Sequence, residues 1–186
     1  MRAVVLATMV ASLVFPVKAL ASRRCPVDLA PLVTSHFRLT LINDATTDEV
    51  PSSGELLVSE GGAVTLMRTD IDAAGKSSRF FVSGRLDTFQ LVALKNAVAD
   101  ALPAAPAETC LIESFEEPGG GHSLFGISEH ALYRDRQTTV RVVVTHNDPS
   151  AGPTPQCPSQ IRALDNVIRH IADAIRLGVR PLQCRP

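Results

Sequence analysis

The sequence predicts an α+β fold in which two helices cover one face of a mainly antiparallel sheet of four to six strands. Two observations support this class. Apolar residues alternate or cluster in short β-branched segments, and two longer segments repeat them at helical spacing. The expected element order is β-β-β-α-β-β-α. Strands and helices that come in groups, without strict alternation, favour an antiparallel sheet with helices on one side.

The expected strands are short segments bounded by polar or glycine-rich residues. The clearest one spans residues 138–145 and is dense in threonine and valine, which fit a pleated surface. The other expected strand segments are 37–42, 55–58, 63–67, 77–83 and 131–133. Three stretches lack such a pattern and are expected to be irregular: residues 22–35, 43–54 and the glycine-rich 113–128.

The two expected helices have clear limits. The first begins at Asp87, which forms a capping-box pattern with Gln90, and it ends before Pro103. The second runs from Ser159 to about residue 177, and Gly178 is a plausible stop. Each helix has one apolar stripe that should face the sheet. The stripe residues are Leu91, Leu94, Val98, Ile161, Leu164, Ile168, Ile171 and Ile175.

The first 21 residues have the features of a cleavable signal peptide. Arg2 precedes an apolar run over residues 3–17. Ala19-Leu20-Ala21 matches the small-x-small pattern that signal peptidase accepts, and we expect cleavage before Ser22. The run is shorter than the roughly 20 apolar residues that span a bilayer. We therefore expect a secreted or periplasmic protein in which residues 22–186 form a single α+β domain with no membrane span after processing.

Four cysteines follow the expected cleavage site, and an even count in an exported chain favours two disulfides. A helix over 158–177 would be about 30 Å long. The segment from Gly178 to Cys184 reaches at most about 23 Å, which disfavours a Cys157–Cys184 bond. We expect Cys110–Cys157 and Cys25–Cys184. These spacings are too wide for a zinc ribbon.

Composition excludes nucleic acid as a partner. The formal net charge is −1, and removal of Arg2 and Lys18 with the signal peptide would lower it to about −3. The chain has no tryptophan and one tyrosine, so it lacks both a basic surface and the aromatic groups that stack on bases. No motif for a cofactor is present, and none is expected.

Two motifs with catalytic or metal-binding precedents fail on inspection. Residues 121–126 contain Gly-x-Ser, but Phe125 stands where a nucleophile elbow needs a small residue, so we expect no catalytic role for Ser123. Residues 70–75 begin like a calcium loop, but Ala74 and Phe81 occupy two ligand positions. A hairpin turn is the expected structure there.

Charged and metal-ligating residues show no site-forming spacing. The histidines lack the i, i+4 pairing of helical metal sites and are expected to face solvent, with no metal bound. They are His36, His122, His130, His146 and His170. Glu113, Glu116 and Glu117 are expected in a solvated loop. Arg162, Arg169 and Arg176 form a basic stripe on the polar side of the last helix, expected to be its wet face rather than a docking surface.

The segment from Glu55 to Val64, a strand, Gly61-Gly62 and a second strand, resembles the emfourin-like proteins. These include inhibitors of a thermolysin-like metallopeptidase. The order of later elements, including Ala101-Leu102-Pro103 at the end of a helix, is similar over about residues 37–177. The signal peptide, the cysteines and the glycine-rich loop depart from the family. The resemblance implies peptidase inhibition.

Two classes of function remain open from the sequence. The first is an exported interaction module, a peptidase inhibitor or a binder of another protein, with Gly61 and Gly62 as contact residues, because glycines allow close approach of a partner's backbone. The second is a small extracytoplasmic enzyme that uses the loop 119–126. A structural envelope protein with no ligand is a further alternative.

Overall fold

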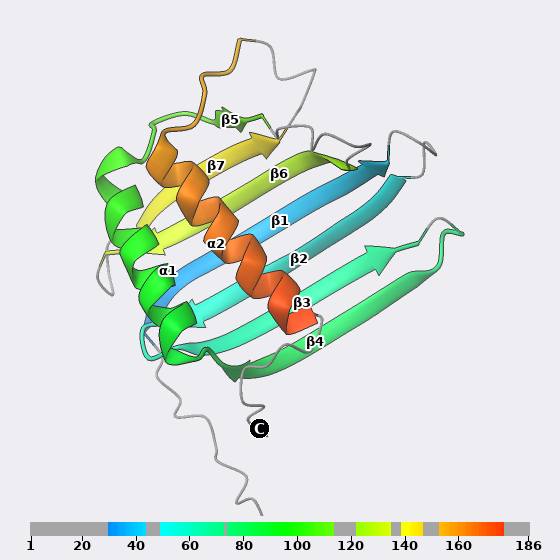
Figure 1. Cartoon of the computed structure of the whole chain (residues 1–186), viewed down its shortest axis with the longest axis horizontal. Helices are drawn as coiled ribbons and strands as arrows, with labels where there is room; N and C mark the ends of the chain where they lie inside the picture. The colour runs from blue at the N-terminus through cyan, green and yellow to red at the C-terminus, as the bar shows by residue number, and fades with distance from the viewer. Residues whose placement is uncertain are drawn as a thin grey trace, which may run out of the picture.

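The described part of the chain forms a seven-stranded sheet with two α-helices on one face (Figure 1). The computed structural model describes residues 30–43, 49–72, 74–113, 122–134, 139–146 and 153–176. The strands are β1 (Pro31–Asn43), β2 (Glu49–Ser59), β3 (Ala63–Ile71), β4 (Ser77–Arg85), β5 (Cys110–Ile112), β6 (His122–Tyr133) and β7 (Thr139–His146). The helices are α1 (Thr88–Ala101) and α2 (Ser159–Arg176).

The strands lie in the order β4-β3-β2-β1-β6-β7-β5. Strands β1 to β4 form an antiparallel meander, after which the chain passes through α1 to the opposite edge of the sheet. Strand β6 then pairs with β1 in the centre, and only the short β5 runs parallel to its neighbour β7. The α+β class with two helices on one face is confirmed, but the expected count of four to six strands is too low.

The strand residues that were not predicted lie in segments that were expected to be irregular. Strand β1 begins at Pro31, β2 at Glu49 and β6 at His122, so the expectation of loops over these residues is wrong. Their small and polar side chains conceal the pattern, while backbone pairing on both sides holds them in the sheet. At Gly126, φ is +152° and a Cβ atom would lie 2.2 Å from the carbonyl oxygen of Arg38, so only glycine allows β1 this close.

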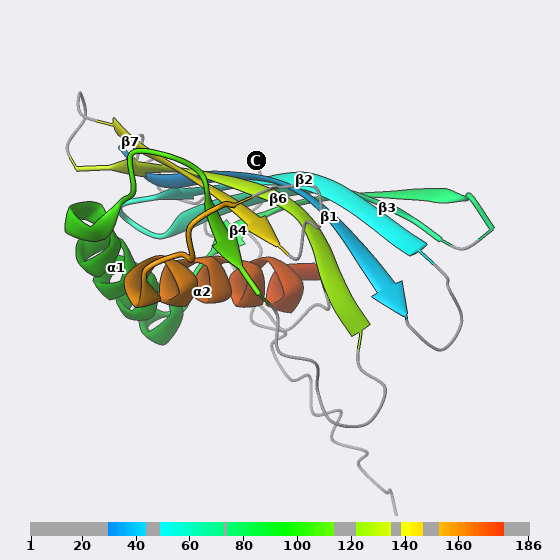
Figure 2. The same ribbon diagram turned by 90° about the horizontal axis from the view of Figure 1, so that it is seen from above.

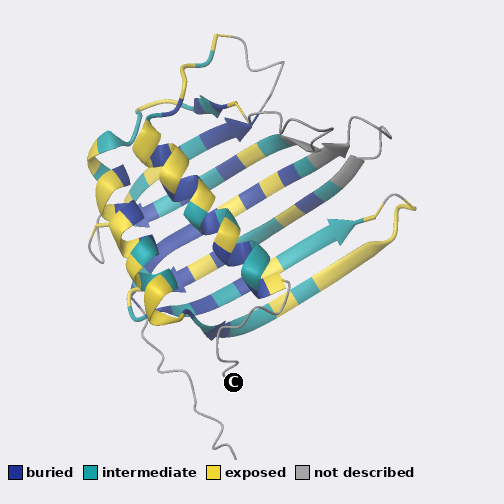
Figure 3. Ribbon diagram, viewed as in Figure 1, coloured by how far each residue is buried: buried dark blue, intermediate teal, exposed yellow. Residues whose placement is uncertain are grey.

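The core lies between the inner face of the sheet and the two helices (Figures 2 and 3). Both predicted apolar stripes face it, because a helix buries the residues that share one side. The buried stripe residues are Leu94, Val98, Ile161, Leu164, Ile168, Ile171 and Ile175, and Leu91 is partly buried. The helices of the described part of the chain include none long and apolar enough to cross a membrane.

Helix α1 begins with the capping box that the sequence predicted. The Asp87 carboxylate accepts a hydrogen bond from the amide of Gln90 at 2.7 Å, and the Gln90 side chain accepts one from the amide of Asp87 at 3.2 Å. Two amides that the helix leaves unpaired are thereby satisfied. Helix α1 lies over one end of the sheet, and α2 crosses it diagonally (Figure 1).

A disulfide joins Cys110 of β5 to Cys157, just before α2, which is one of the two bonds expected from the sequence. The amide of Cys157 also donates to the carbonyl of Leu111 at 2.8 Å, and the amide of Leu111 donates to the carbonyl of Pro155 at 2.8 Å. The entry to α2 is therefore fixed to the edge of the sheet. Cys25, Cys184 and the predicted signal peptide lie outside the described residues.

Truncation of a buried stripe residue tests this packing. Leu94→Ala should lower the free energy of unfolding by about 2–5 kcal/mol, because Leu94 is 0% exposed and its removal leaves a cavity. Val92→Ala on the same helix is the control. Val92 is 51% exposed, so this change should lower the free energy of unfolding only slightly. Urea denaturation measures both. Similar losses for the two variants would contradict the placement of α1.

Candidate functional site

The predicted contact glycines lie in the turn between β2 and β3. Gly62 is buried with φ of +84°, and its carbonyl accepts a hydrogen bond from the amide of Leu86 at 2.9 Å. A Cβ atom there would lie 3.1 Å from the Leu91 side chain of α1. The carbonyl of Gly61 accepts a hydrogen bond from Arg85 at 2.8 Å. A partner contact at this turn stays a prediction. The turn itself lies against the Leu91 side chain of α1.

The other two candidate motifs have ordinary structural roles. Ser123 pairs with Ile42 across β6 and β1, so it lies on a strand and not in the strand–turn–helix setting of a nucleophile elbow. Residues 119–121 lie outside the described residues. The hairpin turn predicted for 70–75 is confirmed: the Asp72 carboxylate accepts hydrogen bonds from the amides of Ala74 at 3.0 Å and Lys76 at 2.8 Å.

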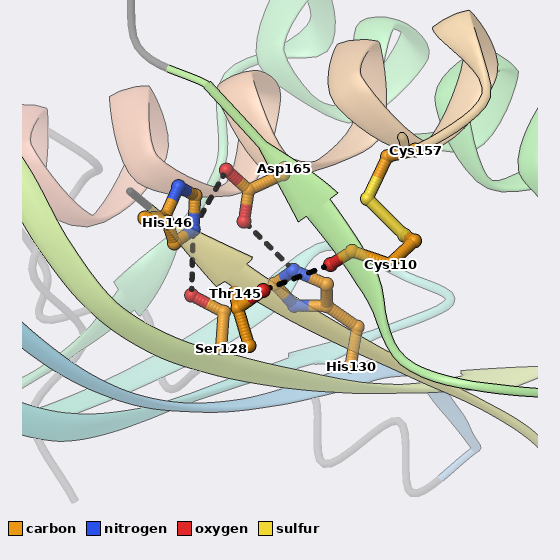
Figure 4. The surroundings of a disulfide bond; sticks show 7 residues. All are labelled: Cys110, Ser128, His130, Thr145, His146, Cys157 and Asp165. Carbon is orange, nitrogen blue, oxygen red and sulfur yellow. Dashed lines mark hydrogen bonds and ion pairs between the residues drawn. A yellow bond between two sulfur atoms is a disulfide. The ribbon is translucent and has the colours of Figure 1, made fainter. Parts of the chain in front are cut away.

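Two histidines contradict the prediction of solvent exposure. His130 of β6 and His146 of β7 are buried under α2, while His36 and His170 are exposed as expected. Both buried rings face Asp165, a fully buried residue of α2 (Figure 4). The Nε2 atom of His130 lies 2.9 Å from Oδ1 of Asp165, and the Nε2 atom of His146 lies 3.5 Å from Oδ2.

Two serine hydroxyls extend this group. Ser35 of β1 lies 2.8 Å from Nδ1 of His130, and Ser128 of β6 lies 3.4 Å from Nε2 of His146. We call these five residues, Ser35, Ser128, His130, His146 and Asp165, the Asp165 cluster. Strand pairing explains the first contact, because Ser35 and His130 are direct partners in the β1–β6 register. Side chains two residues apart on a strand share a face, so Ser128 accompanies His130.

The Asp165 carboxylate is held in its ionised form. Burial raises its pKa, but hydrogen bonds from His130 and His146 and the positive charge of Arg169 outweigh burial, and the pKa lies well below its usual range. Nε of Arg169, one helical turn away, is 2.8 Å from Oδ2 in an ion pair whose angle is not that of an aligned hydrogen bond. Since the carboxylate accepts, Nε2 of His130 carries a proton.

The Ser35–His130–Asp165 chain has the connectivity of a relay that activates a serine nucleophile, but its setting does not fit catalysis. Ser35 is 0% exposed and His130 is 1% exposed, so a substrate carbonyl has no approach to the hydroxyl. Strand β1 pairs with a neighbour on each side, so its amides serve the sheet and do not form an oxyanion hole. Within the described ranges, no group of His, Cys, Asp and Glu is arranged to hold a metal ion.

A cavity of about 550 Å³ lies beside the Asp165 cluster, between α2 and the inner face of the sheet beyond α1. We call it the α2 cavity. Its apolar walls come from the sheet and from α2: Phe37, Leu39, Ile71, Phe80, Ile168 and Ala172. Ser35, Ser128 and His130 also border it, each at most 1% exposed. Three arginines and three aspartates also line it: Arg68, Arg169, Arg176, Asp70, Asp72 and Asp173.

Arg68 connects the sheet to α2 across this cavity. Its guanidinium donates to Asp70 on the same strand, to Asp173 of α2 at 3.0 Å and to Ser52 of β2 at 3.4 Å. The group also lies 5.8 Å from the centre of the Phe37 ring, a cation–π distance. With its donors occupied on three elements, Arg68 has little freedom to reorient, and it fixes α2 above β3.

The predicted wet basic stripe of α2 is only partly correct. Arg162 and Arg176 are exposed, as expected, and Arg176 lies 3.8 Å from Asp173. Arg169 is half-buried because it turns toward Asp165. The sequence held one indication of this arrangement: Asp165 falls between Leu164 and Ile168 on the apolar stripe, where a carboxylate needs partners. Glu113 is exposed, whereas Glu116 and Glu117 lie outside the described residues.

Comparison of the chain with protein-family models, with curated proteins and with solved structures finds no match. The resemblance to the emfourin-like proteins therefore stays a prediction.

Neutralising the buried carboxylate tests the cluster. Asp165→Asn should lower the free energy of unfolding by about 3 kcal/mol, because the change leaves Arg169 without its counterion and replaces the charged acceptor of the His130 hydrogen bond. Asp100→Asn, the same change at an exposed position of α1, should have almost no effect. Urea denaturation at neutral pH would refute the cluster's role if both variants matched the wild type.

The same carboxylate makes stability depend on pH. Its folded pKa lies below the unfolded value of about 3.9, so the folded state gains stability from ionised Asp165 above that value. This contribution should be lost as the pH falls below about 4. The midpoint of urea denaturation should therefore drop more steeply between about pH 5 and pH 3 in wild type than in Asp165→Asn. Parallel profiles would contradict the depressed pKa.

Proposed function

We propose that this protein is an exported binding module that takes a small, mainly apolar ligand into the α2 cavity. The cavity itself carries the proposal. Its volume of about 550 Å³ falls within the roughly 300–1,000 Å³ of small-molecule sites. Such sites combine apolar walls with a few fixed polar groups, and the α2 cavity has both.

Contacts within the protein hold the walls of the cavity in place, which supports binding. Helix α2 is joined to the sheet at three points: by the Cys110–Cys157 disulfide before its start, by Asp165 near its middle, and by Asp173 toward its end. A site that is already formed loses little conformational entropy when a ligand enters, so more of the contact energy appears as affinity.

Export supports the choice of class without naming the ligand. The predicted signal peptide and the disulfide both fit an oxidising compartment outside the cytoplasm. Peptidase inhibition, which the family resemblance implies, remains an open proposal for the β2–β3 turn. A bulky substitution at Gly62, such as Gly62→Arg, would not test inhibition cleanly. The positive φ of Gly62 and its contact with Leu91 would make that substitution destabilise the fold by itself.

A fluorescent apolar probe tests the proposal. N-phenyl-1-naphthylamine is uncharged and emits strongly in apolar sites, and the protein has no tryptophan to interfere. The wild type should give a saturable rise in emission at micromolar concentrations. Ser78→Phe should weaken binding about tenfold or more, because Ser78 of the edge strand β4 lines the cavity and a phenyl ring would fill it.

Ser77→Phe is the matched control. Ser77 is the neighbouring residue on the same strand, also exposed, and it is not among the residues that line the cavity. Successive side chains on a strand point to opposite faces, so this variant should bind like the wild type. No saturable emission in the wild type, or equal loss in both variants, would overturn the proposed site.

A further inference from the structure

The partly buried arginines and aspartates around the α2 cavity already have partners. Arg68 is paired with Asp70 and Asp173, and Arg169 is paired with the buried Asp165. These groups therefore offer little uncompensated charge to an ion.

We infer that the ligand of the α2 cavity is an uncharged molecule with a mainly apolar body, an inference that rests on the proposed function. A charged ligand would give up its hydration in a partly enclosed site without gaining a free counterion. It would have to compete for Arg68 or Asp173 with partners already in place. An uncharged ligand gains the apolar contacts of Phe37 and Phe80 without disturbing these pairs.

Asp173 is the residue that sets this preference. Its carboxylate lies 3.0 Å from Arg68 and 3.8 Å from Arg176, so it balances two guanidinium groups at the cavity wall. An asparagine would keep an oxygen to accept the hydrogen bond of Arg68 and would remove the charge. Asp173→Asn would then remove one negative charge from beside Arg68 and Arg176, and the cavity should admit an anion more readily.

Three probes with one naphthalene body separate charge from shape: 2-naphthol, which is uncharged at neutral pH, 2-naphthoate and 2-naphthylmethylammonium. Their affinities are measured by displacement of N-phenyl-1-naphthylamine. In the wild type, naphthol should bind at least about fivefold more tightly than either ion. In Asp173→Asn, the affinity for naphthoate relative to that for naphthol should rise about threefold to tenfold, an effect that salt reduces.

Asp100→Asn provides the control, because it changes the net charge equally at an exposed site on α1 and should leave all three affinities as in the wild type. An ion that binds the wild type as tightly as naphthol would overturn the inference, and so would an unchanged ratio of naphthoate to naphthol affinity in Asp173→Asn. If N-phenyl-1-naphthylamine binds and Ser78→Phe weakens its binding, but none of the three naphthalene compounds displaces it, the inference is overturned while the proposed function stands. Absence of binding by N-phenyl-1-naphthylamine would overturn the proposed function and the inference with it.

Discussion

The buried carboxylate of Asp165 determines where α2 lies on the sheet. A charge in the core is costly unless it is paired, and here the partners come from β6, from β7 and from the next turn of the helix. Sliding or rotating α2 would separate Asp165 from His130 and His146 and leave the charge unpaired. The apolar stripe alone would tolerate several positions, whereas the carboxylate makes one of them favourable.

The cavity follows from this placement. Helix α1 covers one end of the sheet and α2 crosses it diagonally, so part of the inner face has no helix over it (Figure 1). Phe37 and Phe80 of the sheet line the α2 cavity. Arg68 of β3 joins α2 through Asp173 at the wall of this cavity. Polar residues therefore connect α2 to the sheet at two places, Asp165 in the core and Asp173 at the cavity.

The sequence predicted the features that depend on local pattern. The capping box at Asp87 and the apolar stripes follow from spacing along one segment. The Cys110–Cys157 bond follows from the length of the last helix, which the tail is too short to span back from Cys184 to Cys157. The sequence missed the strand residues around Ser52 and Ser128, because small polar side chains give no alternation and only the neighbouring strands hold them extended. It also missed the burial of His130 and His146, since their partner Asp165 lies on another element and is brought near only by the fold.

Chemical-shift mapping tests most directly whether the α2 cavity is the ligand site. Backbone amide spectra of the 15N-labelled protein would be recorded while N-phenyl-1-naphthylamine is added. The account predicts shifts concentrated at 78–80 of β4 and 168–176 of α2, which border the cavity. Shifts concentrated instead at the exposed apolar residues Met67 and Phe81, or at Phe89 of α1, would contradict it, because the probe would then occupy the surface.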